Sequence, residues 1–457
     1  MQKQNNHLAQ GSVGKLLFKL ALPAIVAQLV NLLYNLVDRI YIGHIPGTGD
    51  IALTGLGLCF PIIMIITAFS SLIGGGGAPR GAIAMGKGDN DGADRILGAG
   101  IWALAFLAIL LTIVVEVFAA PLLTMFGASE ATLPYALNYL RIYAAGTLFV
   151  MFALGLNPFI TTQGFSRDAM LTVIIGAVCN IILDPIFIFA LNMGVQGAAL
   201  ATILSQGISA LYVLRFLTGK KSILRIRRQY LKPDMKILGP VLALGVSPFI
   251  MTATESAISI AFNSSLARYG GDIAVGAMTI ITSIMQLQML PTQGLAQGAQ
   301  PIMSYNYGAG NVDRVRKTYR LLIGCCVGYT MTFWLAVMLF PETFVRICNN
   351  SPELLTATVD ALRIYMLASG LFGIQMGVQQ VFVSLGQAKI SLFIACLRKI
   401  ILLIPLILIL PNFFADKVFA VFLAEPVADF ISLTTAAVLF LLNIRKILSR
   451  ATAKKPA

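Results

Sequence analysis

The sequence predicts an all-α polytopic membrane protein, in which twelve transmembrane helices form two parallel-repeat six-helix bundles around a central cleft. Three observations predict this fold class. The 457-residue chain is 58% hydrophobic and only 11% charged. Apolar segments long enough to cross a bilayer recur along its whole length. Features of the first half return in the same order in the second half, as they do in proteins built from repeats.

Apolar segments mark the predicted spans, because an α-helix needs about 20 residues to cross the hydrocarbon core of a bilayer. Several segments are longer than this, which predicts tilted or bent helices. In chain order the twelve predicted spans are 16–42, 52–85, 96–118, 133–161, 169–191, 195–217, 237–266, 275–304, 319–340, 357–385, 390–410 and 418–442.

The repeat is visible at an offset of 222 residues (140 to 362), since the sequence Leu-Arg-Ile-Tyr begins at Leu140 and again at Leu362. At the same offset Pro79 matches Pro301, Gly86 matches Gly308, and Gly164 matches Gly386. Each half holds an even number of spans, so both halves enter the membrane with the same polarity and are parallel repeats. We therefore predict an N-terminal six-helix lobe at 1–217, a basic cytoplasmic connector at 218–236 and a C-terminal six-helix lobe at 237–457.

The formal net charge of +14 is distributed as expected for a protein at a membrane surface. Lysine and arginine gather in alternate loops and in both terminal segments, with a dense run in the predicted connector. This asymmetry is the positive-inside pattern, and it predicts that both termini are cytoplasmic. We expect a monomeric, multi-pass protein of the cell inner membrane whose basic loops meet anionic membrane lipids. We expect no binding to nucleic acid.

A polar pair stands out in the fifth predicted span. Asn180 and Asp184 lie one helical turn apart in an otherwise apolar stretch, so both project from one helix face. An ionisable side chain inside a membrane is costly unless it faces a cavity, pairs with a partner or binds an ion. The pair therefore predicts a site for a proton or a small cation, with a structural contact between helices as the alternative. Pro185 removes a backbone donor and predicts a bend.

The remaining motifs do not indicate an enzyme. Six cysteines and two histidines are scattered without metal-ligand spacing, and no catalytic dyad is evident. The glycines at 74–77 lack the Gly-Lys-Ser/Thr sequence of a phosphate-binding loop, so an ATP-driven pump is not indicated. We interpret these glycines as a close contact between helices, and we expect no cofactor other than a coupling ion.

Several short motifs together point to a known family. They are Leu20-Ala-Leu-Pro23, Asp38 in Asn35-Leu-Val-Asp38-Arg, Pro79 before Gly86-Lys-Gly, Gln163-Gly164, Asn180 with Asp184-Pro185, and Gly194-Val-Gln-Gly-Ala-Ala-Leu-Ala-Thr202. Through them, and over nearly its whole length, the chain resembles the MATE family of multidrug and toxic-compound extruders. The branch it resembles is the one grouped with DinF and MepA, in the MOP flippase superfamily.

The resemblance implies a secondary antiporter that exports amphipathic organic cations in exchange for Na⁺ or H⁺ by alternating access. It also implies a coupling site, with residues of the matching types at Asp38, Asn180, Asp184 and Thr202. A rise of about 1.5 Å per residue places Asp38, Asp184 and Thr202 in the outer half of the bilayer, so a shared pocket is geometrically possible. Two carboxylates in one pocket repel each other, which favours a bound proton or Na⁺. The sequence does not decide between the two ions.

Other residues are candidates for helix bending and for the substrate cleft. Pro23 predicts a bend in the first span, as Pro185 does in the fifth. For the cleft we predict an acid and a pliable, Met-rich surface, with ordinary packing as the alternative for the methionines; these residues are Glu255, Met285, Gln286 and Met289.

Two questions stay open at this point. The last two spans hold Arg398, Lys399, Glu425 and Asp429, which form either a structural charge-paired cluster or a gating one. The alternative function is an exporter or flippase of lipid-linked or polysaccharide precursors, which would favour a cleft rich in basic residues.

Overall fold

The computed structural model describes residues 7–348 and 351–452, and all regular elements over these residues are helices. The N-terminal half contains α1 (Val13–Gly43), α2 (Gly49–Gly86), α3 (Asn90–Met125), α4 (Leu133–Ala145), α5 (Thr147–Thr161), α6 (Ser166–Pro185), the π-helix η2 (Ile186–Ala190) and α7 (Gly194–Thr218). A connector with the short 3-10 helix η3 (Arg228–Tyr230) follows.

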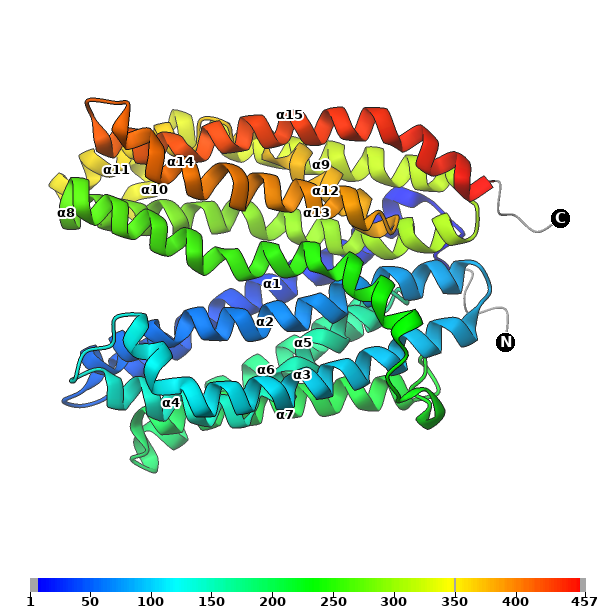
Figure 1. Ribbon diagram of the computed structural model, residues 1–457, viewed down its shortest axis with the longest axis horizontal. Coiled ribbons are helices and arrows are strands. Elements are labelled where there is room, and N and C mark those ends of the chain that lie inside the picture. The colour runs from blue at the N-terminus through cyan, green and yellow to red at the C-terminus, as the bar shows by residue number, and fades with distance from the viewer. Residues whose placement is uncertain (1–6, 349–350, 453–457) are drawn as a thin grey trace.

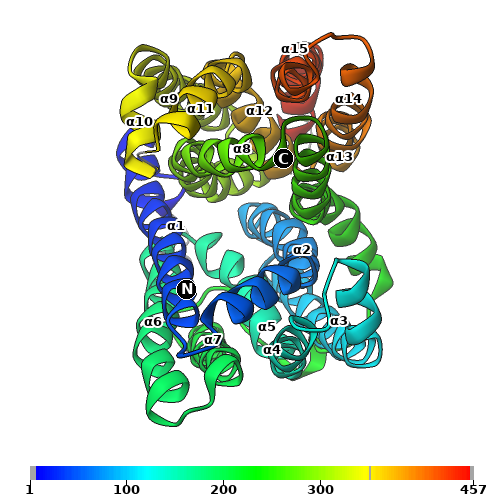
Figure 2. The ribbon, with the colours of Figure 1, turned by 90° about the vertical axis from the view of Figure 1, so that its left-hand side faces the viewer.

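The C-terminal half begins with α8 (Met235–Gly308). It continues with α9 (Val312–Leu339), α10 (Pro341–Cys348), α11 (Pro352–Tyr365), η4 (Ser369–Leu371), α12 (Phe372–Ser384), α13 (Ala388–Cys396), the π-helix η5 (Leu397–Leu403), α14 (Ile404–Ile409), η6 (Leu410–Asn412) and α15 (Lys417–Thr452). The helices of each half gather in their own bundle (Figure 1, Figure 2).

The predicted number of spans is confirmed over the residues that the structure describes. Nine helices are long and apolar enough to cross a membrane, and two bent pairs add one span each. Helix α8 supplies two spans, because Gly271 in its middle has a positive φ of 63° and the chain turns back there (Figure 1). Glycine adopts this conformation without steric cost. Counting α8 twice gives the twelve spans that the sequence predicts.

Two of the predicted spans, 133–161 and 357–385, are broken. Helices α4 and α5 meet at 59°, and α11 and α12 meet at 52°. A glycine in each break touches a neighbouring helix: a Cβ atom on Gly146 would lie 2.4 Å from Ile203, and one on Gly370 would lie 3.0 Å from Trp334. Both breaks follow the repeated Leu-Arg-Ile-Tyr sequence. Close packing therefore bends the same span in each half.

The two bundles meet where α2 crosses α8. A Cβ atom on Gly86 would lie 2.0 Å from the carbonyl oxygen of Tyr305, and one on Gly308 would lie 2.1 Å from that of Ile83. The repeat offset relates both glycines and both carbonyls, so the crossing is symmetrical. Gly76, in the glycine run interpreted as a close helix contact, packs on the α8 backbone in the same way. This crossing lies at the end of the molecule that carries both chain termini (Figure 1).

The segment before α1 is fixed to this same end. Leu8 is buried, and its carbonyl oxygen accepts a hydrogen bond of 2.9 Å from Asn306 Nδ2 at the end of α8. Arg314 Nη1, at the start of α9, donates to the carbonyl oxygen of Gly11 at 2.7 Å. The N-terminal segment is therefore packed against α8 and α9 at this end of the molecule.

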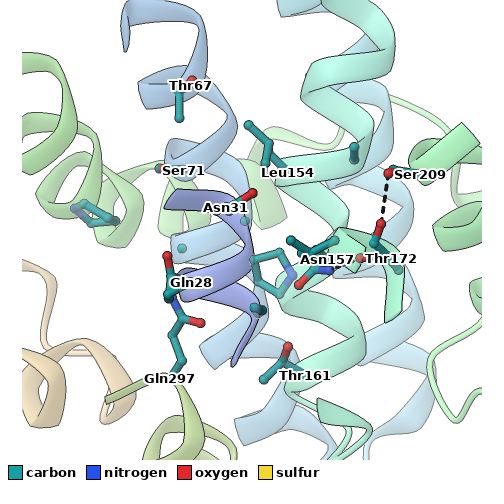
Figure 3. A pocket seen from close by; sticks show the side chains of 18 of the residues that line it. Gln28, Asn31, Thr67, Ser71, Leu154, Asn157, Thr161, Thr172, Ser209 and Gln297 are labelled. Carbon is teal, nitrogen blue, oxygen red and sulfur yellow. Dashed lines mark hydrogen bonds between the residues drawn. The ribbon is translucent and has the colours of Figure 1, made fainter. Parts of the chain in front are cut away.

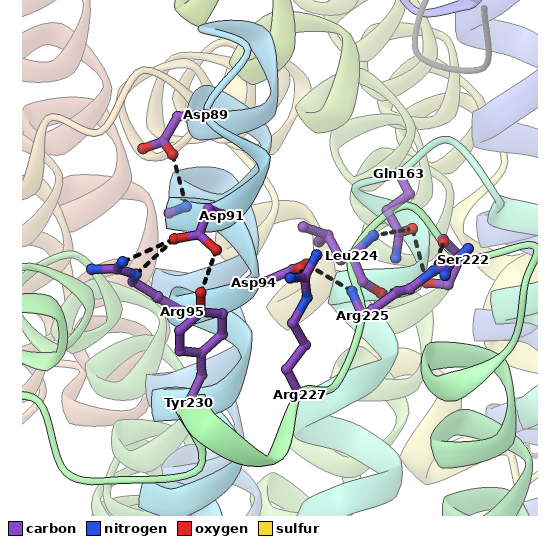
Figure 4. A network of polar contacts seen from close by, with 11 residues as sticks. Asp89, Asp91, Asp94, Arg95, Gln163, Ser222, Leu224, Arg225, Arg227 and Tyr230 are labelled. Carbon is purple, nitrogen blue, oxygen red and sulfur yellow. Dashed lines mark hydrogen bonds and ion pairs between the residues drawn. The ribbon is translucent and has the colours of Figure 1, made fainter. Parts of the chain in front are cut away.

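The connector is tied to the N-terminal half (Figure 4). Gln163 Oε1 accepts a hydrogen bond of 3.0 Å from the backbone N–H of Leu224. Asp94 accepts from the backbone N–H of Arg225 at 2.8 Å and pairs with Arg227 Nε at 2.8 Å. A segment that the sequence presents only as a basic run thus folds against the ends of α3 and α5. The limits of the two lobes at 217 and 237 stay a prediction.

Candidate functional site

The four predicted coupling residues lie on three adjacent helices. Asp38 is near the end of α1, Asn180 and Asp184 are on α6, and Thr202 is on α7. All four side chains are buried, with Asp184 at 0% exposure. Pro185 has no N–H to continue the α-helical bonding, and beyond it the chain widens into the π-helix η2. The structure therefore brings together the residues that the sequence places at similar depth.

Asn180 is the centre of the contacts between these residues. Its Nδ2 donates to Asp184 Oδ1 at 3.2 Å and lies 3.5 Å from Thr202 Oγ1. Thr202 Oγ1 donates to the carbonyl oxygen of Ala198 at 3.0 Å. The carboxyl groups of Asp38 and Asp184 lie close to each other. Two ionised carboxylates this close repel each other, so the pair favours a bound proton or a small cation.

Several oxygens of the site face no donor. Asp38 Oδ1, Asn180 Oδ1 and Asp184 Oδ2 are buried and have no hydrogen-bond partner among the residues that the structure describes. Buried polar atoms usually have partners, and such exceptions mark places where an ion, a water or a functional group acts. Na⁺, a hard cation, binds best to oxygen atoms, and a proton needs only the carboxyl pair. The geometry fits either ion.

Three neighbouring residues of the site were missed by sequence reasoning. Tyr34 lies beside Gln206, and Tyr139 lies beside Thr202. Tyr34 precedes Asp38 by one helical turn, and Gln206 follows Thr202 by one turn, so helical spacing alone would have placed both on the same faces. Tyr139 carries no such signal, because it lies on α4, in a span that is broken.

A cavity of about 430 Å³ lies between the two bundles, beside this site. Its wall includes Tyr34, Asn180 and Thr202, but Asp38 and Asp184 lie behind that wall. Nine carboxamide side chains from both halves line it, namely Gln28, Asn31, Asn157, Asn180, Gln206, Gln297, Gln300, Gln379 and Gln380. The lining residues include no charged side chain. Figure 3 shows Gln28 and Asn31 of α1 on the same cavity as Gln297 of α8.

The structure does not bring the four predicted cleft residues to this cavity. Met285 is buried, Met289 is partly buried and Gln286 is exposed elsewhere on α8. Glu255 forms an ion pair with Lys399 and is about half exposed. Met251, one turn before Glu255, does line the cavity. Pro23 is buried within α1, which continues as one helix through it.

A second charged cluster occupies the C-terminal half. Arg398 Nη2 pairs with Glu425 Oε1 at 2.7 Å, and its Nε pairs with Asp429 Oδ1 at 2.6 Å. Lys399 Nζ donates to the carbonyl oxygen of Met251 at 2.7 Å, in addition to its pair with Glu255. Both basic residues lie on the π-helix η5. The cluster is therefore charge-paired, unlike the site around Asp38 and Asp184.

The chain is similar to known transporters. The family model described as MatE matches residues 23–186 and 248–409. The multidrug export protein MepA of Staphylococcus haemolyticus (strain JCSC1435) is 24% identical over 93% of this chain and 94% of its own. MepA of Staphylococcus aureus (strain MSSA476) is 23% identical over 90% of each chain.

Solved structures agree with these matches. The crystal structure of MATE in the bent conformation has a TM-score of 0.90 and 25% identity, covering 99% of this chain and 100% of that chain. The outward-facing conformation of a multidrug resistance MATE family transporter has a TM-score of 0.89 and 24% identity, covering 98% and 99%. These findings confirm the resemblance drawn from the sequence. Since the family model covers most of both halves, the chain belongs to the MatE family of membrane transporters and is not an enzyme.

Proposed function

We propose that this protein is a multidrug efflux antiporter that exports amphipathic organic cations in exchange for H⁺ or Na⁺. The observation that carries the proposal is the carboxyl pair of Asp38 and Asp184, which lies directly behind a cavity between two bundles. Membership of the MatE family supports the transport class, and relatives over the whole chain are named multidrug export proteins. The coupling ion is itself transported, and the proposed reaction needs no prosthetic group.

The proposed coupling step starts at Asn180. This residue contacts Asp184 on one side and lines the cavity on the other. When a proton or Na⁺ leaves the carboxyl pair, the negative charge of the pair is no longer compensated, and the two groups repel each other. Asn180 and Thr202 then reorient toward the new charge, and this alters the cavity wall that they form. Ion occupancy is thereby linked to cargo binding without cargo touching either carboxylate.

The cavity suits the proposed cargo. Carboxamide oxygens from both bundles, such as those of Gln28 and Gln297, accept hydrogen bonds from a cation's N–H groups. Methyl and methylene surfaces of residues such as Leu154 and Met376 meet its apolar parts. Because both halves hold the cargo, rocking of the bundles would expose it to either side in turn. The glycine crossing holds α2 and α8 in close contact at the end that carries the termini.

The orientation in the membrane follows from the charge distribution. We propose that the end with both termini and the connector is cytoplasmic, in the inner membrane, because the basic loops gather there. Anionic lipids are the proposed partners of these loops. The role of Pro23 and Pro185 in bending, and contact of Glu255, Met285, Gln286 and Met289 with cargo, stay predictions for another arrangement of the bundles.

A flippase for lipid-linked or polysaccharide precursors receives no support from the cavity. Such anionic precursors would need basic partners, and the residues that line the cavity include neither lysine nor arginine. The carboxyl pair also has no evident use in moving an anion. We therefore retain the cation antiporter as the proposed function.

The test is exchange by the purified protein in liposomes with ethidium as cargo. A pH gradient and a Na⁺ gradient are imposed separately, with no nucleotide present. We expect ethidium to move against its own gradient when one of the two ions flows the other way. Movement at the same rate with no ion gradient, or only with added ATP, would contradict the proposal.

A further inference from the structure

A second cavity lies far from the carboxyl pair, at the end of the molecule that carries the termini. It has a volume of about 380 Å³. One wall is the loop and helix start at 386–390, and the other is the end of α15 at 443–450. We name it the basic groove, because Lys389, Lys446 and Arg450 line it and the lining includes no acidic residue. Over the described part of the chain, none of these three bases forms an ion pair.

The repeat shows what is unusual about the basic groove. Gly386, in its wall, is the repeat counterpart of Gly164. In the N-terminal half the base near Gly164 has partners within the chain. Lys221 pairs with Asp168 at 2.8 Å and lies over the ring of Phe165. The C-terminal half has bases at this place without an acid. Its positive charge is therefore available to an anion from outside the chain.

The start of α13 adds donors to the same wall. The first bond of this helix to its cap runs from the backbone N–H of Ser391 to the carbonyl oxygen of Gln387. The N–H groups of Ala388, Lys389 and Ile390, which line the groove, precede that bond and have no acceptor within the helix. Helix N-termini of this kind favour phosphate and other anions. Together with the three bases, they predict recognition of a phosphate group.

Apolar surface continues from the groove along both walls. On α15, Val438, Leu442 and Lys446 follow one another at a spacing of one helical turn, and Leu442 is 72% exposed. On α13, exposed Phe393 lies one turn beyond Lys389. A soluble phosphate has no use for such a surface. A phospholipid has both parts, since its acyl chains lie along apolar stripes while its phosphate meets basic side chains near the membrane surface.

We propose that the basic groove binds the phosphate group of an anionic phospholipid, with its acyl chains running between α13 and α15. Lys446 and Arg450 hold the phosphate from one wall, and Lys389 and the start of α13 hold it from the other. This site is separate from the antiport site, and it rests on the proposed function only in that anionic lipids are the partners proposed for the basic loops.

The test is native mass spectrometry of the full chain in detergent after removal of bound lipid. Phosphatidylglycerol and phosphatidylcholine with the same acyl chains are added in parallel, and glycerol 3-phosphate supplies a phosphate without chains. We expect the protein to retain phosphatidylglycerol in preference to phosphatidylcholine. Equal retention of both lipids, or displacement of phosphatidylglycerol by equimolar glycerol 3-phosphate, would overturn the proposal.

Variants locate the binding in the groove. Lys446→Gln with Arg450→Gln should weaken phosphatidylglycerol binding by about thirtyfold, because each base near an anionic membrane surface contributes about fivefold. The matched control is Arg445→Gln with Lys220→Gln, which removes the same charge outside the groove and should leave binding unchanged. If the double variant does not fold, Lys389→Gln on the opposite wall provides the same test, and it should also weaken binding. Equal binding by the control and groove variants would refute the assignment.

Discussion

The two halves share one helix plan but treat buried charge in opposite ways. In each half the fifth span widens into a π-helix, η2 in the first and η5 in the second. Beside η2, Asp38 and Asp184 lie close together, and neither forms an ion pair within the described part of the chain. Beside η5, Arg398 forms ion pairs with both Glu425 and Asp429. Both halves thus use the same scaffold, but the proposed ion site keeps its acids without an ion pair, while the second cluster is charge-paired.

The largest effect is expected from Asp184→Asn. The carboxamide has the shape of the carboxyl group, but it cannot release a proton and carries no negative charge to attract Na⁺. Ion-driven exchange of ethidium in liposomes should fall to the background level, while the thermal unfolding temperature stays the same or rises, because an unpaired buried acid has been removed. Asp38→Asn should give the same result.

Asp168→Asn serves as the matched control for this change. Asp168 lies at the start of the same helix and pairs with exposed Lys221, so its loss should leave exchange close to the wild-type rate. If Asp184→Asn exchanged ethidium at the normal rate, the carboxyl pair of the N-terminal half would not be the coupling site.

Arg398→Met is expected to have the largest effect on stability. The change leaves Glu425 and Asp429 buried without a cation, and breaking a buried pair in this way costs about 3–5 kcal/mol. Thermal unfolding in detergent should show a fall in midpoint. Replacing the two acids by Gln and Asn in the same chain should restore most of the loss, because no charge is then left unpaired.

The control for Arg398→Met is Arg346→Met, which breaks an exposed pair with Glu342 and should cost less than about 1 kcal/mol. If Arg398→Met kept the wild-type midpoint but abolished exchange, the second cluster would be a gating element, and the contrast between the two halves would fail.

Thr202→Val should have a smaller effect, confined to Na⁺. The change removes an oxygen beside Asn180 and leaves the carboxyl pair intact. Since one hydrogen-bonding group contributes about 1 kcal/mol, the Na⁺ concentration for half-maximal exchange should rise by about fivefold. Exchange driven by a pH gradient should be unchanged. Ser205→Ala, one turn along α7 on the same cavity, is the control and should change neither Na⁺-driven nor pH-driven exchange. If Thr202→Val lost both kinds of exchange, Thr202 would have a general role in packing.

Hydropathy and the repeat were enough to predict the fold, because span length and the even number of spans per half determine it. The breaks at Gly146 and Gly370 were not predictable in detail, since they depend on contacts with Ile203 and Trp334 in other helices. A glycine shows its role only when its neighbour is known.

The candidate site was predicted in part for similar reasons. Asn180 and Asp184 share a helix face by spacing alone, so the structure brings them together as expected. The cavity wall was harder, because hydropathy does not tell which face of a mostly apolar helix turns inward. On α8 that face presents Gln297 and Gln300 rather than Met285.

Glu255→Gln has the smallest expected effect on transport and bears most directly on that wall. Glu255 is about half exposed, but its neutralisation leaves buried Lys399 with only the carbonyl oxygen of Met251 as a partner. The thermal unfolding midpoint should therefore fall, though less than in Arg398→Met. Since Glu255 lies outside the cavity, the KM for ethidium should change by less than about twofold, which is within the effect of a rim charge. A tenfold rise in KM for ethidium, with no change for an uncharged cargo, would instead place Glu255 against the cation, as the sequence predicts. The C-terminal half would then share in cargo binding through a charge, and the division between the halves would apply only to the coupling ion.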